Sequence, residues 1–173
     1  MRRVIYGGAC SLDGFLTDRS GSVDWLHFSK DVEQIMARSW ANTDTILLGR
    51  KTWQAAAAQG GGGGSMPGIK AYIFSRTLTS APKGGELVST DAGEFVRELK
   101  SQPGKDIVVM SGGNLAASLL RAGVIDEVGL NIHPVLLGSG TPAFLDHGTR
   151  VALELIECRQ LDGGCVFVNY RVK

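Results

Sequence analysis

The chain has 173 residues, 43% of them hydrophobic, and 18 Lys and Arg against 17 Asp and Glu. This length and apolar content suit one globular domain with a buried core, and a nearly balanced charge without a basic stripe argues against nucleic acid or a membrane surface as a partner. The three cysteines and three histidines show no metal-ligand spacing, so we expect no metal site and free thiols in a reducing cytosol. The N-terminus lacks the long apolar region of a signal peptide, which favours a cytoplasmic location.

Four short apolar runs in the first two thirds of the chain do not alternate with polar residues. Such runs are typical of buried strands in a mainly parallel sheet. Apolar residues at helical spacing lie between them. Ser29 is the expected N-cap of one helix, and Asp91 with Glu94 forms the expected capping box of another. Asn114 is the expected N-cap of a third helix, which ends at Gly123. The predicted strands cover residues 4–6, 45–48, 71–74 and 107–110.

The C-terminal part changes character. Apolar residues alternate with polar residues or glycine over 128–132, and residues 153–160 and 165–172 flank Asp162-Gly163-Gly164, a hairpin signal. The pattern predicts strand–helix units followed by antiparallel strands on the edge of the same sheet. We therefore expect one α/β domain over residues 1–173, with a central mixed, mainly parallel sheet and an antiparallel C-terminal hairpin.

One segment is low in complexity, because alanines at 55–58 are followed by Gln59, glycines at 60–64 and Ser65. This composition is typical of a flexible linker. The predicted structure on both sides favours a mobile glycine-rich loop over residues 59–68 within the domain. A domain boundary and an introduced sequence are the alternatives.

Glycines, hydroxyls and cations directly follow three predicted strands. Because the carboxyl ends of parallel strands meet at one edge of a sheet, we expect these clusters to share a ligand. Backbone N–H groups at a helix start and guanidinium groups both bind phosphate, so the clusters predict a site for a dinucleotide with an extra phosphate. Taken singly, each has a simpler interpretation as solvated cations, a helix cap or a tight turn. The clusters are Gly49-Arg50-Lys51-Thr52, Ser75-Arg76-Thr77 and Ser111-Gly112-Gly113-Asn114-Leu115.

These residues also carry a resemblance. Gly49-Arg50-Lys51-Thr52-Trp53 resembles the Gly-Arg-x-Thr motif of dihydrofolate reductases. Other motifs resemble the reductase domain of the bifunctional riboflavin-biosynthesis deaminase-reductase, and the likeness extends in order from Val4 to Tyr170. It implies a stand-alone member of the dihydrofolate reductase-like superfamily, with that three-layer fold. The motifs are Ser11-Leu12-Asp13-Gly14, the Gly112-Gly113 turn, and Ile125-Asp126-Glu127 through Pro134, Gly138 and Phe144.

The resemblance implies NADPH as hydride donor to a small-molecule substrate. By motif match, the first cluster holds the pyrophosphate and 2′-phosphate, the second surrounds the adenosine ribose, and the third contacts the pyrophosphate and nicotinamide side. The implied cofactor residues are Ala9, Leu16, Gly49, Arg50, Lys51, Thr52, Ser75, Arg76, Thr77, Ser111, Gly112, Gly113, Asn114 and Leu115.

A substrate pocket is expected between the loop over 13–25, the helix start near Asp31 and the turn at Ser111. Its apolar lining suits a planar heterocycle or a carbonyl compound. Asp31 is the candidate catalytic residue as a proton donor, with a plain helix-start role as the alternative. Trp25 either walls the pocket or anchors its loop, and Asp13 either lines the pocket or shapes a turn. The expected substrate-binding residues are Asp13, Phe15, Trp25, Phe28 and Ser111.

Two departures from the related families leave the substrate open. Asp31 falls one position later than the pterin-binding acid of dihydrofolate reductases, and Ser111 stands where riboflavin-pathway reductases carry a glutamate. A true dihydrofolate reductase, an aminouracil reductase and a non-catalytic nucleotide-binding protein therefore remain as alternatives. A homodimer is also expected, since the strands over 128–132 and 166–172 offer an apolar face or a sheet edge that needs covering.

Overall fold

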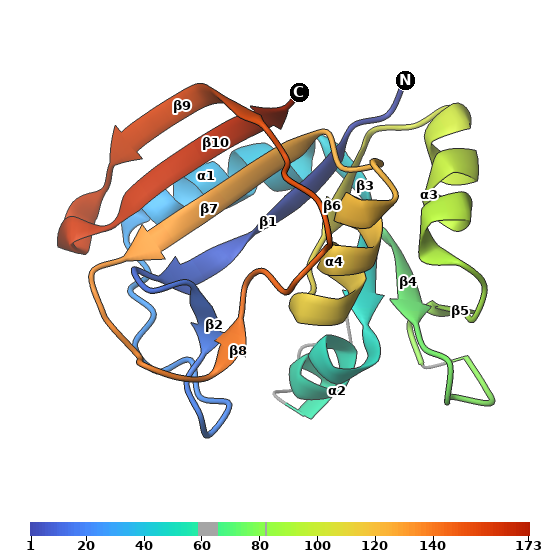
Figure 1. Cartoon of the computed structure of the whole chain (residues 1–173), viewed down its shortest axis with the longest axis horizontal. Helices are drawn as coiled ribbons and strands as arrows, with labels where there is room; N and C mark the ends of the chain where they lie inside the picture. Colours follow the sequence, from blue (N-terminus) through green and yellow to red (C-terminus); the bar gives the residue numbers. More distant parts are fainter. Residues whose placement is uncertain (59–65, 82) are drawn as a thin grey trace.

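An 8-stranded sheet has the order β5-β4-β3-β6-β1-β7-β10-β9, and Figure 1 shows the helices packed on its faces. The structure is a computed structural model that describes residues 1–58, 66–81 and 83–173. Neighbours from β5 to β7 pair in parallel, whereas β10 pairs antiparallel with both β7 and β9. The strands are β1 (Val4–Ser11), β3 (Thr43–Gly49), β4 (Lys70–Phe74), β5 (Glu86–Val88), β6 (Asp106–Val109), β7 (Glu127–His133), β9 (Leu153–Gln160) and β10 (Val166–Val172).

The predicted three-layer fold, with a mixed sheet and an antiparallel C-terminal hairpin, is confirmed. Helices α3 (Ala92–Ser101) and α4 (Gly113–Arg121) cover one face of the sheet, and α1 (Lys30–Ala41) and α2 (Arg50–Ala58) contribute Trp40 and Trp53 to the cluster on the other. A smaller antiparallel pair joins β2 (Phe15–Thr17) to β8 (Thr141–Pro142). No helix among the described residues is long and apolar enough to cross a bilayer.

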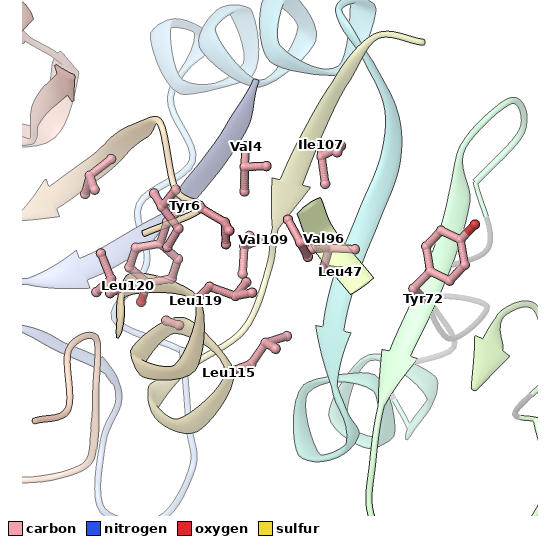
Figure 2. Close-up of a cluster of buried hydrophobic side chains, with 14 of the residues drawn as sticks. Val4, Tyr6, Leu47, Tyr72, Val96, Ile107, Val109, Leu115, Leu119 and Leu120 are labelled. Carbon is pink, nitrogen blue, oxygen red and sulfur yellow. The ribbon is translucent and has the colours of Figure 1, made fainter. Parts of the chain in front are cut away.

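The core explains why the central strands carry unbroken apolar runs. Ile46 and Leu48 of β3 pack into the cluster beneath α1 and α2, while Leu47 packs into the cluster beneath α3 and α4. All three are at most 3% exposed. Figure 2 shows the cluster beneath α3 and α4, where the side chain of Val109 on β6 lies beside Leu119 of α4. A strand buried on both faces has no polar side to alternate with.

Strand β7 differs from the prediction. The alternation over 128–132 grouped it with antiparallel strands, but β7 pairs in parallel with β1, from Ile5 opposite Glu127 to Ser11 opposite His133. The crossover through α4 links β6 to β7 past β1 and delivers β7 parallel to both. Successive side chains of β7 point to opposite faces of the sheet, and Val128 and Leu130 lie in the core beneath α4. This alternation gives the faces of the strand but not the direction in which it pairs.

The edge of the sheet also lies elsewhere than expected. Strands β7 and β10 each have neighbours on both sides, so neither the segment 128–132 nor 166–172 is an edge. On this side of the sheet the edge strand is β9, whose Leu153, Leu155 and Ile156 are 44%, 54% and 42% exposed. The hairpin turn Asp162-Gly163-Gly164 folds β9 onto the outer side of β10 and thereby makes β9 the last strand.

The helix starts match the sequence signals in two of three cases. The side chains of Ser29 and Asp91 accept the predicted bonds from the backbone nitrogens of Val32 and Glu94. The N-cap prediction for Asn114 was wrong, because α4 starts earlier, with Gly112 as N-cap and Asn114 inside the first turn. Glycine lets the chain turn two residues sooner than the side-chain signal indicates.

Most of the predicted glycine-rich loop lies outside the described residues. Residues 59–65 are not described, so its mobility stays a prediction. Of the described remainder, Met66 and Ile69 form an isolated antiparallel bridge directly before β4.

Tyr6 ties the core to the segment after β8. Its side chain is 1% exposed, and its hydroxyl donates to the carbonyl oxygen of Ala143 at 2.5 Å. The ring of Phe144 packs edge-on against Tyr6, with ring centroids 5.4 Å apart. Burial raises the pKa of the Tyr6 hydroxyl, so it remains a donor at physiological pH.

We predict that Tyr6→Phe lowers the free energy of unfolding by about 1–2 kcal/mol, because it leaves the buried carbonyl oxygen of Ala143 without its hydrogen-bond donor. Urea denaturation measures the change. Tyr170→Phe is the matched control, because no hydrogen bond from the Tyr170 hydroxyl is found among the described residues, and it should be near neutral. An equal effect of the two substitutions would contradict the role of the Tyr6 bond.

Candidate functional site

Four neighbouring strands end on the same side of the sheet, and the predicted clusters lie along this carboxyl edge, at the ends of the strands. In the order β4, β3, β6 and β1, the parallel strands end at Phe74, Gly49, Val109 and Ser11. The pairing of Gly49 with Phe74 and of Leu47 with Val109 keeps these ends level. The structure therefore brings together the predicted cofactor clusters Gly49-Arg50-Lys51-Thr52, Ser75-Arg76-Thr77 and Ser111-Gly112-Gly113-Asn114-Leu115, with Ala9 on the adjoining strand.

The first and third clusters touch at Gly49 and Ser111. The hydroxyl of Ser111 accepts a hydrogen bond from the Gly49 nitrogen at 3.2 Å. A Cβ at position 49 would lie 2.6 Å from that hydroxyl oxygen, closer than side chains approach. Ser111 is 7% exposed, so the oxygen is held in place by its surroundings. A side chain at position 49 would therefore force the Ser111 hydroxyl to move away from the Gly49 nitrogen.

The N-termini of two helices face this carboxyl edge, and few side chains of their own compete for their backbone N–H groups. Helix α4 begins at Gly112 with no side-chain cap bond, and α2 begins directly after Gly49 with no acidic residue in its first turn. In the part of the chain that the structure describes, Arg50, Lys51 and Arg76 make no salt bridge. Unpaired cations beside helix N-termini form an environment that suits a phosphate or pyrophosphate.

The turn after β4 is shaped by its own serine. The Ser75 hydroxyl accepts from the backbone nitrogens of Thr77 and Leu78 at 3.2 and 3.1 Å. Arg76 and Thr77 are exposed at the tip of this turn. The local bonds explain why a hydroxyl directly follows the strand, and they leave the guanidinium of Arg76 on the surface.

Leu16 covers the glycine turn. A Cβ on Gly112 would lie 3.0 Å from a Leu16 methyl and 3.1 Å from the Thr141 methyl, and a Cβ on Gly113 would lie 2.8 Å from a Leu145 methyl. The β2–β8 pair carries Leu16 and Thr141 to this position. A side chain at Gly112 would require these methyl groups to shift by a few tenths of an ångström. A side chain at Gly113, where φ is +43°, would also strain the backbone.

Asp13 is engaged by backbone and hydroxyl donors. Its carboxylate accepts from the Ser11 hydroxyl at 2.6 Å and from the backbone nitrogens of Leu137 and Gly138 at 3.1 and 2.8 Å. These bonds, with Ser11 first, lower the pKa of Asp13. The carboxylate therefore ties the turn after β1 to the loop after β7, which is the turn-shaping alternative for this residue.

Of the other predicted substrate residues, Trp25 and Phe28 lie on the loop before α1, and Phe15 lies on the β2–β8 ribbon. The ring of Trp25 packs edge-on against His133 with centroids 5.3 Å apart, and its Nε1 is buried with no partner among the described groups. Phe28 is 64% exposed, and Phe15 pairs with Pro142 in the β2–β8 ribbon. Asp31 lies in the first turn of α1, where its Oδ2 accepts from the Asp162 nitrogen at 3.3 Å.

His133 is a residue that the sequence did not single out. It is 2% exposed at the end of β7, and its ring contacts Trp25, the backbone of His27 and Cys165. The one available signal was the alternation of β7, which puts position 133 on the face opposite Val128 and Leu130. Its partners come from distant segments, which no local pattern reveals.

One hollow formed by described residues lies away from these clusters. It has a volume of about 430 Å³ and is lined by residues that include Arg2, Asp44, Thr45, Lys70 and Tyr72. Thr45 and Lys70 are near the starts of β3 and β4, so the hollow is at the opposite edge of the sheet. We place the candidate site by the convergence of chemical groups rather than by this hollow.

We predict that Gly49→Ala lowers the free energy of unfolding by about 1–3 kcal/mol, as overpacking does. Ser111→Ala removes the clashing oxygen, and the Ser111 Cβ lies 3.8 Å from the new methyl, an ordinary contact. The Gly49→Ala penalty should therefore shrink in the Ser111→Ala background, as a double-mutant cycle by urea denaturation measures. Additive effects would contradict the contact. Gly8→Ala, with its nearest neighbour at 4.0 Å, is a control without a clash.

The model of the RibD C-terminal domain family matches residues 2–167 of the chain. The uncharacterised protein YyaP of Bacillus subtilis strain 168 is 32% identical to this chain over an alignment of 179 positions, gaps included. The alignment covers 98% of this chain and 94% of YyaP.

Solved structures share the fold. A protein of Shewanella sp. PV-4, provisionally assigned to riboflavin biosynthesis, superposes with a TM-score of 0.83 at 23% identity, over 99% of each chain. A dihydrofolate reductase of Enterococcus faecalis, complexed with NADP(H), superposes with a TM-score of 0.72 at 13% identity, over 99% of this chain and 96% of that one. At such identities the likeness establishes the architecture alone.

Proposed function

Since the chain belongs to the RibD C-terminal domain family, we propose that it is an NADPH-dependent oxidoreductase. It transfers a hydride to a small, planar heterocyclic or carbonyl substrate. The observation that carries the proposal is the meeting of two helix starts with three cations that have no salt bridge within the described chain, at the carboxyl edge of β4, β3, β6 and β1.

The residues present fit the cofactor. Backbone N–H groups at the starts of α2 and α4 would hold the pyrophosphate, because the first turn of α2 has no acidic residue and α4 has no side-chain cap bond. Arg50 and Arg76 would hold the 2′-phosphate through charge-assisted bonds. Lys51, Thr52, Ser75 and Thr77 would complete the phosphate and ribose contacts.

The nicotinamide side would lie along β1 and the glycine turn. Ala9 on β1 and Leu16 on β2 would flank the ring, and Leu16 already packs on Gly112. NADPH supplies the hydride when bound, and the chain's part is to align the ring with the acceptor and to exclude water. Small residues at Gly112 and Gly113 allow the covering segment to approach closely.

The substrate would bind beside Trp25. A buried indole N–H with no acceptor among the described residues costs free energy, and an oxygen or ring nitrogen of a heterocycle would satisfy it. Phe15 and Phe28 would add apolar contact area. Asp13 and Ser111 would act on the substrate indirectly, because both are already bonded within the turns.

Two other enzymes of this fold, a dihydrofolate reductase and an aminouracil reductase, remain alternatives, as does a nucleotide-binding protein without catalysis. Turnover of NADPH over a panel of pterins, pyrimidines and carbonyl compounds separates them. Cofactor binding without turnover of any compound would favour the non-catalytic alternative.

We predict that Arg50→Ala weakens the binding of NADPH by about 1.5–3 kcal/mol, which is a loss of affinity of roughly ten- to a hundredfold, and weakens the binding of NADH far less. The reason is that only NADPH carries the 2′-phosphate. Fluorescence titration with both cofactors measures the difference. Arg121→Ala, a change at the far end of α4, is the control. Equal losses of affinity for NADPH and NADH would show that Arg50 does not bind the 2′-phosphate. If the unaltered protein bound neither cofactor, the proposed function would be overturned.

We predict that Asp31→Asn reduces turnover while NADPH affinity stays almost unchanged, if Asp31 donates or steers the proton. Steady-state kinetics and cofactor titration measure the two quantities. Glu33→Gln, on the same exposed helix turn, is the control. Unchanged turnover in Asp31→Asn would leave the residue with its bond to Asp162 and a structural role alone.

We also propose a homodimer through the edge strand β9. Leu153, Leu155 and Ile156 expose apolar surface along an unpaired strand edge, an arrangement that favours association. Light scattering should give twice the chain mass, and Leu155→Glu should give the monomer mass. A monomer of the unaltered protein at micromolar concentration would contradict the dimer.

A further inference from the structure

His133 connects three segments that are distant in sequence. Its imidazole contacts Trp25 and His27 of the loop before α1, Cys165 at the start of β10, and Asn131 on its own strand. The cluster lies on the α1 side of the sheet, opposite the core beneath α4. None of these contacts is used by the proposed cofactor site.

The hydrogen bonds define which nitrogen of the His133 imidazole carries the proton. Nδ1 of His133 lies 3.3 Å from the backbone nitrogen of His27. A backbone N–H only donates, so Nδ1 must accept, and the proton of the neutral ring must be on Nε2. Nε2 lies 3.2 Å from the side-chain amide of Asn131, and an Nε2–H there needs an oxygen.

Asn131 can supply that oxygen. Its Oδ1 is otherwise buried without a partner among the described residues. A half-turn of the amide places Oδ1 on the Nε2–H of His133, because the oxygen and nitrogen of the amide occupy equivalent positions. One tautomer of His133 thus satisfies both the ring and the orphan oxygen of Asn131.

The same ring holds the loop. Trp25 packs edge-on against the imidazole at an interplanar angle of 85°, and the next contact along the loop is the N–H of His27. The side chain of His27 then meets the hairpin, since a Cβ on Gly163 would lie 2.4 Å from its ring. The loop is therefore held between β7 and the β9–β10 turn.

We propose that His133 is the positioning residue for the loop that carries Trp25, and that it holds the loop only while its imidazole is neutral. The proposal rests on the proposed function solely in placing Trp25 beside the substrate. An imidazolium has N–H groups on both nitrogens. Its Nδ1–H would face the N–H of His27, so the bond that His27 donates to Nδ1 would be lost. The other group at Nδ1 is the Sγ of Cys165, which is 3.4 Å away and is only a weak acceptor.

The titratable groups around the ring do not compensate a positive charge. His27 on the loop would repel it, and Cys165 on β10 is a thiol whose pKa is raised by burial. Asp31 of α1 directs its Oδ2 to the nitrogen of Asp162 in the hairpin, not to the imidazole. Burial, and then the proximity of His27, lowers the pKa of His133.

The sign of the pH dependence follows. A lowered pKa means that the folded loop favours the neutral ring, so its contribution is complete above the ordinary histidine value of about 6.5. It is lost as the pH falls from there toward the lowered value of the folded protein. Loop release is therefore expected on the acid side of neutrality.

Fluorine NMR of the full chain labelled with fluorotryptophan tests this without any cofactor. Trp25→Phe assigns the Trp25 resonance, and the resonances of Trp40 and Trp53 report global unfolding. In the unaltered protein the Trp25 resonance should shift as the pH falls below about 6.5, while the other two stay in place.

Two variants complete the test. His133→Asn keeps an oxygen for the His27 N–H and cannot titrate, so the Trp25 resonance should stay native throughout the range. His133→Ala should give the released position already at mildly alkaline pH. The same titration in His133→Asn as in the unaltered protein, or a native Trp25 resonance in His133→Ala, would overturn the proposal. If His133→Ala fails to fold, the His133→Asn result still decides. NADPH titration of the unaltered protein tests the proposed function separately.

Discussion

The parallel pairing of β3 with β6, closed by the contact of Ser111 with Gly49, is the constraint on which the candidate site depends. It aligns two strand ends and therefore two turns that are 62 positions apart in the chain. Each turn leads directly into a helix, so the alignment also brings two helix starts together. A side chain at position 49 would displace the Ser111 hydroxyl that joins the two turns.

The two halves of the site are built differently. On the cofactor side, the groups follow their strands within a few residues, and their positions result from strand order alone. On the substrate side, the groups are held by contacts between distant segments, such as Asp31 with Asp162 and Trp25 with His133. The first half is tied to the rigid core, while the second depends on a loop.

This difference explains what the sequence could predict. Buried strands carry apolar runs such as Ile46-Leu47-Leu48, and the cluster after each run marks the strand end, so the fold and the meeting of the clusters at one end of the strands could be predicted. The N-cap at Asn114 was wrong because backbone geometry at Gly112 overrides a side-chain preference. The direction of β7 depends on the crossover through α4, which local alternation does not encode. His133 was missed because its partners are remote in sequence.

The most direct test of the account is the map of backbone amide shifts that NADPH causes in NMR spectra of the labelled protein. The largest shifts are expected at the starts of α2 and α4, at the turn after β4 and near Ala9. Small shifts are expected around the hollow lined by Arg2 and Tyr72. Shifts confined to that hollow, or to the edge strand β9, would contradict a cofactor site at the carboxyl edge of the sheet.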